Sequence, residues 1–153
     1  MSKARFSTFG GFAVICVVLI PAFAISRVGE GDTGSGAVEV AAEDVPAQEL
    51  IANNCGQCHT LAAAGIDGVV GPDLDERLVP TGTNTAGDYT RIYGQTIQAI
   101  TCGFGGGRMP KAIVRGENAR TAAAFVAVYA GQIGRGPTTD MSAADKPPPP
   151  PCP

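Results

Sequence analysis

The chain has 153 residues, of which 44% are hydrophobic and 16% are charged, and its formal net charge is -3 at pH 7. This length leaves room for one domain with extensions and excludes a multi-domain enzyme. The acidic balance and the absence of a Lys/Arg run argue against a nucleic-acid partner. Because His59 is the only histidine, one chain cannot build a zinc or copper centre that needs several imidazoles.

Residues 1–26 are predicted to be a transmembrane anchor or a signal peptide. Lys3 and Arg5 precede a stretch without charged residues that extends to Arg27. As a helix this stretch is about 31 Å long, which matches the ~30 Å hydrocarbon layer of a bilayer. The pattern Ala22-Phe23-Ala24 also fits a cleavage site, so a secreted soluble protein is the alternative to the favoured anchor. Both interpretations place the domain on the extracytoplasmic side, because the positive flank stays inside.

Composition divides the rest of the chain into three parts. Residues 27–45 are rich in Gly, Ser, Ala and acidic residues and are expected to form a flexible tether. Residues 135–153 contain the run Pro147–Pro151 and are expected to be extended or disordered rather than packed. The folded domain is therefore predicted at 46–134.

Three helical segments are predicted within this domain. The first covers about 45–54, with Asp44 as its N-cap. The last has apolar side chains at helical spacing and ends near Gly131 or Gly134. Its apolar positions are Ala122, Phe125, Val126, Tyr129 and Ile133.

The middle helix also has one apolar face. That face contains Tyr89, Ile92, Tyr93, Ile97 and Ile100. Gly94 is expected to weaken or split this helix, and Gly103 is a natural stop. No convincing strand pattern appears, so the predicted fold class is an all-α domain of three or more helices, preceded by the transmembrane helix.

The segment Cys55-Gly56-Gln57-Cys58-His59 carries the strongest chemical signal. C-x-x-C-H is the pattern of c-type haem attachment, in which each thiol forms a thioether with the haem and the histidine binds the iron. A thioredoxin-like dithiol would need a βαβ context, and a zinc half-site would need further ligands at matching spacing. The motif therefore predicts one covalent haem c, held by Cys55 and Cys58, with His59 as an axial iron ligand.

Over most of residues 46–134 the sequence resembles the class I cytochromes c, which are small all-helical proteins wrapped around one haem. A short helix precedes the attachment motif, as in that family. Gly71-Pro72-Asp73-Leu74 looks like the family's Gly-Pro-x-Leu loop. Residues 105–110, which read Gly-Gly-Gly-Arg-Met-Pro, resemble the segment that delivers a methionine sulfur to the haem. The helix around Phe125 looks like the C-terminal helix that crosses the first.

The resemblance implies the remaining site residues. The carbonyl of Pro72 is expected to accept the Nδ1–H of His59 and to fix its tautomer and orientation. Met109 is expected to be the second axial ligand, and it is the only thioether of the predicted domain, because Met1 and Met141 lie outside it. A gap-filling core side chain is the alternative role for Met109. A His/Met pair occupies both axial positions and disfavours substrate and oxygen chemistry.

The predicted function is a one-electron carrier in a membrane electron-transport (respiratory) chain, not an enzyme. Its partners would be electron-donor and electron-acceptor redox proteins at the membrane. The runner-up is a fixed haem subunit of a larger quinol- or oxygen-reacting oxidoreductase complex. A haem peroxidase or gas sensor would require Met109 to be absent from the iron or to dissociate from it. A third class is a structural module in which the haem only stabilises the fold.

The other cysteines form no regular disulfide framework. Cys16 lies in the apolar N-terminal stretch and is expected to be a small apolar filler. Cys102, just before the Met109 segment, is expected to be a half-buried free thiol. The alternative is a disulfide with Cys152, which would pin the proline tail onto the domain.

Charged residues near the motifs suggest a dipolar surface. The basic ones around the Met109 segment are Arg108, Lys111 and Arg115. The acidic ones after the attachment motif are Asp67, Asp73, Asp75 and Glu76. We expect the basic side to meet an acidic partner and to steer the encounter, with ordinary solvated charges as the alternative.

Overall fold

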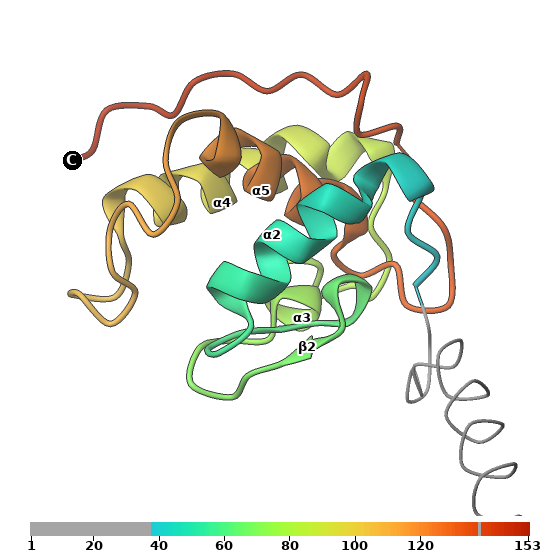
Figure 1. Cartoon of the computed structure of the whole chain (residues 1–153), viewed down its shortest axis with the longest axis horizontal. Coiled ribbons are helices and arrows are strands. Elements are labelled where there is room, and N and C mark those ends of the chain that lie inside the picture. The colour runs from blue at the N-terminus through green and yellow to red at the C-terminus, as the bar shows by residue number, and fades with distance from the viewer. Residues whose placement is uncertain (1–37, 138) are drawn as a thin grey trace, which may run out of the picture. The chain divides into compact units, whose positions relative to one another are not determined.

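The computed structural model describes residues 38–137 and 139–153. The predicted anchor or signal peptide at 1–26 lies outside the described residues. Within the described part, no helix is long and apolar enough to cross a membrane. In chain order the elements, with η for a 3₁₀ turn, are η1 (Ala42–Asp44), α2 (Val45–Cys55), β1 (Thr60–Leu61), η2 (Ala62–Ala64), β2 (Ile66–Asp67), α3 (Leu74–Leu78), η3 (Ala86–Asp88), α4 (Tyr89–Cys102) and α5 (Gly116–Tyr129) (Figure 1).

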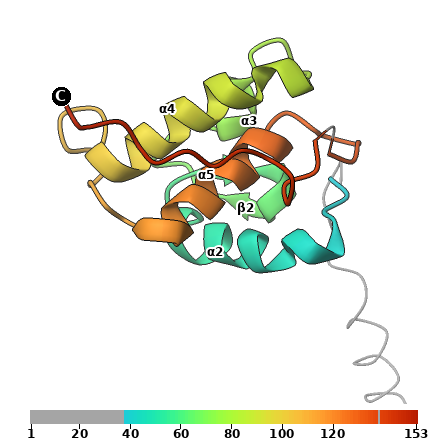
Figure 2. The same ribbon diagram turned by 90° about the horizontal axis from the view of Figure 1, so that it is seen from above.

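The described unit is mostly helical, which agrees with the predicted class, and α5 is its central helix. Figure 2 shows α5 between α2 and α4, and it packs against both of them. Every side chain from Ala122 to Tyr129 is buried. Many of these residues are alanines, whose small side chains allow neighbouring helices to approach closely. The last predicted helix is therefore present, but it begins earlier than its apolar pattern indicated and ends at Tyr129. Ile133 lies outside it and is 54% exposed, so its place on the apolar face was wrongly predicted.

The middle helix, α4, is continuous, so the prediction that Gly94 splits it is wrong. Its apolar face packs into the core with Ile92 fully buried, and this packing outweighs the low helix propensity of one glycine. The helix ends at Gly103 as predicted. Gly103 has φ 77°, and a Cβ placed there would lie 2.8 Å from the carbonyl oxygen of Met109.

Two short strands and α3 were not predicted. β1 and β2 form a two-stranded antiparallel sheet in which Thr60 pairs with Asp67 and Leu61 with Ile66. Each strand has only two residues, too few to show an alternating pattern in the sequence. These elements form the loop region between the attachment motif and α4.

Asp75 ties α3 to two distant segments. Its side chain is buried, and its two oxygens accept hydrogen bonds from the backbone N–H of Ala62 at 2.8 Å and of Gly131 at 2.7 Å. Burial raises the pKa of the Asp75 carboxyl above 3.8, and the two N–H donors oppose that shift in part. Asp73 starts α3 as its N-cap by accepting from the N–H of Asp75 at 2.8 Å.

Residues 38–45 belong to the folded unit, which corrects the predicted tether in that range. Val38 and Val40 pack against the hydrophobic core. Asp44 makes no side-chain cap for α2. Instead, its buried carboxylate accepts a hydrogen bond from the hydroxyl of Tyr129 at 2.6 Å, and that hydroxyl also accepts the N–H of Ala41 at 3.1 Å. Burial, together with the Asp44 contact, raises the pKa of Tyr129 to about 12.

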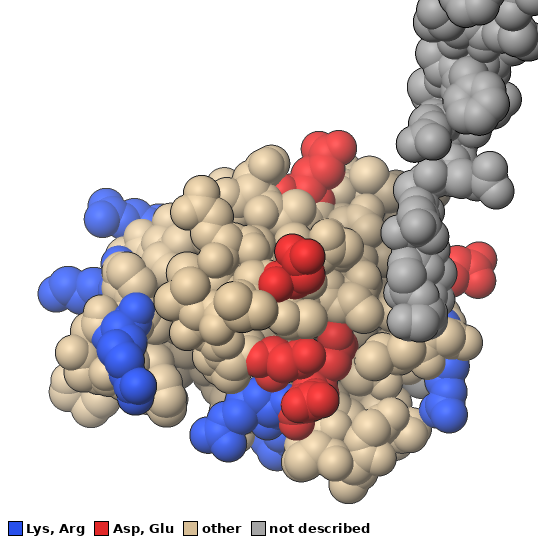
Figure 3. All heavy atoms as spheres, turned by 90° about the horizontal axis from the view of Figure 1, so that it is seen from below, with Lys and Arg blue, Asp and Glu red and all other residues tan. Residues whose placement is uncertain are grey.

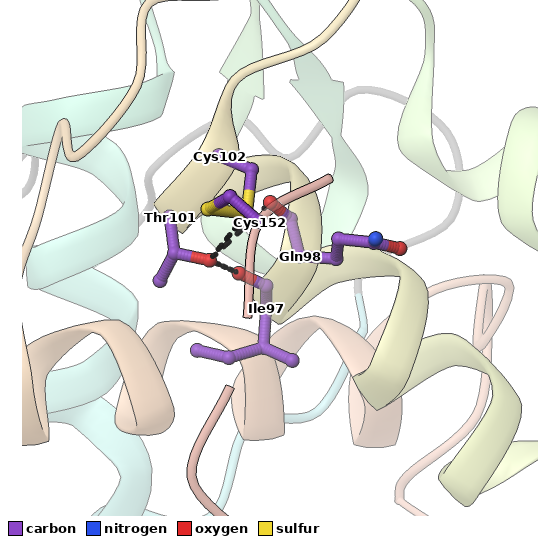
Figure 4. Close-up of a disulfide and its surroundings, with 5 residues drawn as sticks. All are labelled: Ile97, Gln98, Thr101, Cys102 and Cys152. Carbon is purple, nitrogen blue, oxygen red and sulfur yellow. Dashed lines mark hydrogen bonds between the residues drawn. A yellow bond between two sulfur atoms is a disulfide. The ribbon is translucent and has the colours of Figure 1, made fainter. Parts of the chain in front are cut away.

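The C-terminal segment is extended, as predicted, and residues 147–153 are exposed. It is nevertheless attached to α4, so the prediction that it does not pack on the domain is wrong. Figures 1 and 2 both show it running alongside α4. The hydroxyls of Tyr89 and Tyr93 donate to the carbonyls of Asp145 at 2.8 Å and Pro147 at 2.7 Å. A disulfide joins Cys102 to Cys152 across 50 residues, which replaces the favoured free thiol with the alternative pairing (Figure 4).

Replacing Asp75 by Asn should lower the free energy of unfolding by about 2 kcal/mol, because an amide has one acceptor oxygen and would leave a buried N–H unpaired. Urea unfolding followed by circular dichroism measures this change. Glu76→Gln on the exposed side of α3 is the matched control, and it should change stability by less than about 0.5 kcal/mol. Equal stability of the two variants would contradict the role given to Asp75.

Desolvation of Asp75 adds a second contribution to stability, which depends on pH and is separate from its two hydrogen bonds. Its pKa is raised in the folded protein, so the folded state binds the proton more tightly than the unfolded state. The associated stability is complete below the ordinary value of 3.8 and decreases as the pH rises through the raised pKa. The difference in free energy of unfolding between the wild type and Asp75→Asn should therefore become smaller as the pH increases through the pKa of Asp75. A difference that becomes larger with pH would show that this pKa is lowered instead.

Candidate functional site

The Cys55–His59 motif continues the helical winding of α2. The carbonyl of Cys55 accepts hydrogen bonds from the N–H of Cys58 at 3.1 Å and of His59 at 3.0 Å. These two bonds close one further turn, so both thiols and the imidazole leave the backbone close together. A group bonded to Cys55 and Cys58 would therefore restrict the positions that the His59 ring can reach.

The imidazole of His59 is oriented from the loop that follows β2. Its Nδ1 lies 2.9 Å from the carbonyl oxygen of Pro72, which is the contact that the sequence predicted. Because a carbonyl can only accept, Nδ1 must carry the proton in this contact. The lone pair of the neutral ring is then on Nε2, the atom that a metal would bind.

Two glycines allow this loop to pack directly on the motif. The N–H of Gly68 donates to the carbonyl of His59 at 3.0 Å, and the N–H of Gly71 donates to that of Cys58 at 2.6 Å. A Cβ on Gly68 would lie 2.6 Å from the carbonyl oxygen of Gly56, and one on Gly71 would lie 2.7 Å from Cε1 of His59. This role of the two glycines was not predicted, although glycines on both sides of Val69 and Val70 were a visible signal in the sequence.

Cys55 and Cys58 are both free thiols. Cys55 packs half-buried against the core, and Cys58 is exposed. Burial, with a smaller effect of nearby Cys58, raises the pKa of the Cys55 thiol to about 11. Redox-active C-x-x-C sites have a lowered thiol pKa, so this arrangement does not favour the thioredoxin-like alternative.

Met109 belongs to a separate hairpin after α4. Phe104 and Met109 pair in antiparallel fashion, and the N–H of each donates to the carbonyl of the other at 3.1 Å. The turn between them is made by Gly105, Gly106 and Gly107, with φ of 65°, 69° and 93°, a region that favours glycine. Met109 and residues 102–107 line an open hollow of about 500 Å³.

The prediction that Met109 is the only thioether of the folded domain is wrong. Met141 is 6% exposed and packs in the hydrophobic core. Elimination alone therefore does not select Met109. The two side chains differ in position, since Met109 lines the hollow and Met141 does not. His59 is not among the lining residues either, so the structure groups four predicted site residues at the motif and leaves Met109 on its own loop.

The loops that carry Pro72 and Met109 expose large apolar side chains. Val69 and Val70, just before Gly71-Pro72, are 89% and 81% exposed, and Phe104 is 67% exposed. Burying such surface is favourable by about 25 cal/mol per Å². Both loops therefore carry exposed apolar surface whose burial would be favourable.

The charged residues are segregated only in part. The three basic residues around the Met109 loop are exposed: Arg108, Lys111 and Arg115. Asp75 is buried and does not contribute to an acidic surface, which corrects the prediction. Figure 3 shows basic side chains at one end of one face and acidic side chains near its middle, with further basic ones beside them.

Comparisons with known proteins do not assign this site. No protein-family model matches the chain, and neither a curated protein nor a solved structure is detectably similar to it. Among the described residues, no three His, Cys, Asp or Glu side chains form a group that could hold a metal ion. The chemistry of the site is therefore argued from the thiols, the imidazole and the thioether.

Replacing Gly71 by Ala should displace the His59 ring and break its contact with Pro72, since the new Cβ would lie 2.7 Å from Cε1 and 2.8 Å from Nδ1. The Nδ1 proton, observed by NMR, should then exchange rapidly with solvent. Gly87→Ala is the matched control, because its Cβ would meet only the Thr85 hydroxyl at 3.7 Å. An unchanged Nδ1 proton in Gly71→Ala would contradict this packing.

Proposed function

We propose that this chain is a mono-haem c-type cytochrome that carries single electrons between redox proteins at a membrane. The observation that supports it most is the turn from Cys55 to His59, in which two free thiols accompany an imidazole whose Nδ1 is engaged by the Pro72 carbonyl. That contact leaves Nε2 for iron. A structural histidine would not need two free cysteines in the same turn.

The donor set fits a haem. Cys55 and Cys58 would hold it through thioethers, and His59 and Met109 would be the axial ligands. When bound, the haem would supply an Fe(III)/Fe(II) couple whose potential a Met/His pair raises. The exposed Val69, Val70 and Phe104 side chains fit the apolar faces of such a group.

The other residues of the proposed site orient the iron ligands and keep a substrate away from the iron. Pro72 holds the proton on Nδ1 of His59, and Gly71 keeps the ring against the loop. The glycines before Met109 supply the positive φ angles of the turn that carries it. If His59 and Met109 both bound the iron, no position would remain for a substrate, so we favour a carrier over a peroxidase or gas sensor.

The partners are proposed to be electron-donor and electron-acceptor proteins outside the cytoplasm. The uncharged stretch after Arg5 supports a membrane anchor, although it lies outside the described residues. Anchoring would hold the carrier near membrane partners at an effective concentration of about mM. Reversible oxidation and reduction of the full chain in membrane fractions would support this location.

The first experiment is expression of the full chain in a host that attaches haem c. We expect coloured protein that keeps its pigment during acid–acetone extraction, because thioethers are covalent. The Cys55→Ser/Cys58→Ser double variant should release its pigment or bind none. Wild-type protein that stays colourless, or that loses its pigment on extraction, would overturn the proposal.

Replacing Met109 by Ala tests the second ligand. The variant should lose the sulfur-to-iron charge-transfer band at the red end of the visible spectrum and bind carbon monoxide. Its reduction potential should fall by on the order of 0.1 V, within the ~0.8 V range that axial ligands set. Met141→Leu, a change of similar volume in the core, should keep the band and the potential. Loss of the band in Met141→Leu alone would assign the ligand to Met141.

A further inference from the structure

The Met109 hairpin has few attachments to the rest of the domain. Residues 104–108 are exposed. Within it, backbone bonds pair Phe104 with Met109, and the Arg108 guanidinium donates to the carbonyl of Gly105 at 3.3 Å. Met109 packs against the hydrophobic core, and a backbone bond from the N–H of Ala112 to the carbonyl of Ile100 at 2.8 Å ties the end of the hairpin to α4. The last turn of α4 is therefore the base on which the hairpin stands.

The C-terminal segment is attached to α4 at three points in matching order. The Tyr89 hydroxyl donates a hydrogen bond to the carbonyl of Asp145, and the Tyr93 hydroxyl donates one to the carbonyl of Pro147. A disulfide joins Cys102 to Cys152. The segment thus follows α4 in the same direction, from the first residue of the helix to Cys102, its last residue.

The spacings of these attachments also match. A proline run rises about 3.1 Å per residue, so Pro147 to Cys152 spans roughly 16 Å. The α-helix rises about 1.5 Å per residue, so Tyr93 to Cys102 spans roughly 14 Å. From Asp145 to Pro147 and from Tyr89 to Tyr93 both spans are roughly 6 Å. A stiff extended segment of this length can therefore reach all three attachment points on α4 without a loop between them.

The covalent end of the rod lies at the hairpin. Cys102 and Met109 line the same hollow. Figure 4 shows the disulfide beside Thr101, whose hydroxyl donates to the carbonyl of Ile97 at 2.7 Å and lies 3.6 Å from the sulfur of Cys102. The last turn of α4 is thus held from within the helix and from the tail.

We propose that residues 145–152 are a splint on α4 that holds the base of the Met109 hairpin and thereby positions the Met109 sulfur for the iron. The claim that the splint positions the Met109 sulfur rests on the proposed function. The claim that the splint holds the base of the hairpin does not. Cys102 and Cys152 are positioning residues in this arrangement, because they act through the hairpin rather than on the haem.

The test compares amide hydrogen exchange in the full-length wild type and in Cys152→Ser. Exchange at the amides of Phe104, Met109 and Ala112 should become at least about tenfold faster in the variant, because local opening costs less. The amide of Ala130, which donates to Val126 at 3.0 Å at the end of α5, should be unaffected. Unchanged exchange in the hairpin, or equal acceleration at Ala130, would overturn the splint.

Two further variants separate the covalent link from its stiffness. Replacing Pro148–Pro151 with glycines keeps the disulfide but removes the rod, so hairpin exchange should again become faster. Asp145→Asn changes only an exposed side chain of the tail and should behave as wild type. Hairpin exchange at the wild-type rate in the glycine variant would show that stiffness has no role.

Visible spectra of the same samples test the position of the sulfur. Cys152→Ser should show a weaker sulfur-to-iron band and a lower reduction potential than the wild type. A wild type without haem or without that band would refute the proposed function, while hydrogen exchange would still decide on the splint. Faster hairpin exchange with an unchanged band would show that the splint does not position Met109.

Discussion

The buried carboxylate of Asp75 holds together the part of the molecule on which the His59 contact depends. It accepts the N–H groups of Ala62, after the attachment motif, and of Gly131, after the central helix α5. Because α3 follows Pro72 directly, fixing α3 also fixes the carbonyl that faces His59. The orientation of the imidazole is thus linked to the packing of α5 by one side chain whose hydrogen bonds go to residues outside the motif.

Much of the fold was visible in the sequence where a regular pattern spans many residues. The apolar faces of α4 and α5 predicted both helices, and the Gly71-Pro72 pattern led to the contact at His59. Asp75 was predicted as a surface charge because its two donors are distant in sequence. The same limit explains Asp44, whose position before α2 suggested a cap while Tyr129 at the end of α5 binds it.

The two ends of the domain were misjudged for a common reason. Low apolar content before α2 and the proline run near the C-terminus both predicted segments without packing. In the structure each segment is held by tyrosine hydroxyls on the main helices, from Tyr129 at one end and from Tyr89 and Tyr93 at the other. Composition describes how a segment behaves alone and does not show which hydroxyls will meet its backbone.

The order of the cysteines along the chain has a consequence for biosynthesis. In a polypeptide made from its N-terminus, Cys55, Cys58 and Cys102 are all translated before Cys152, whose partner lies 50 residues earlier. Until then, an oxidant could join Cys102 to Cys55 or Cys58, the two thiols that the proposed haem would use. Under the proposed function, attachment of haem to Cys55 and Cys58 before the tail is made would remove this competition and leave Cys102 for Cys152.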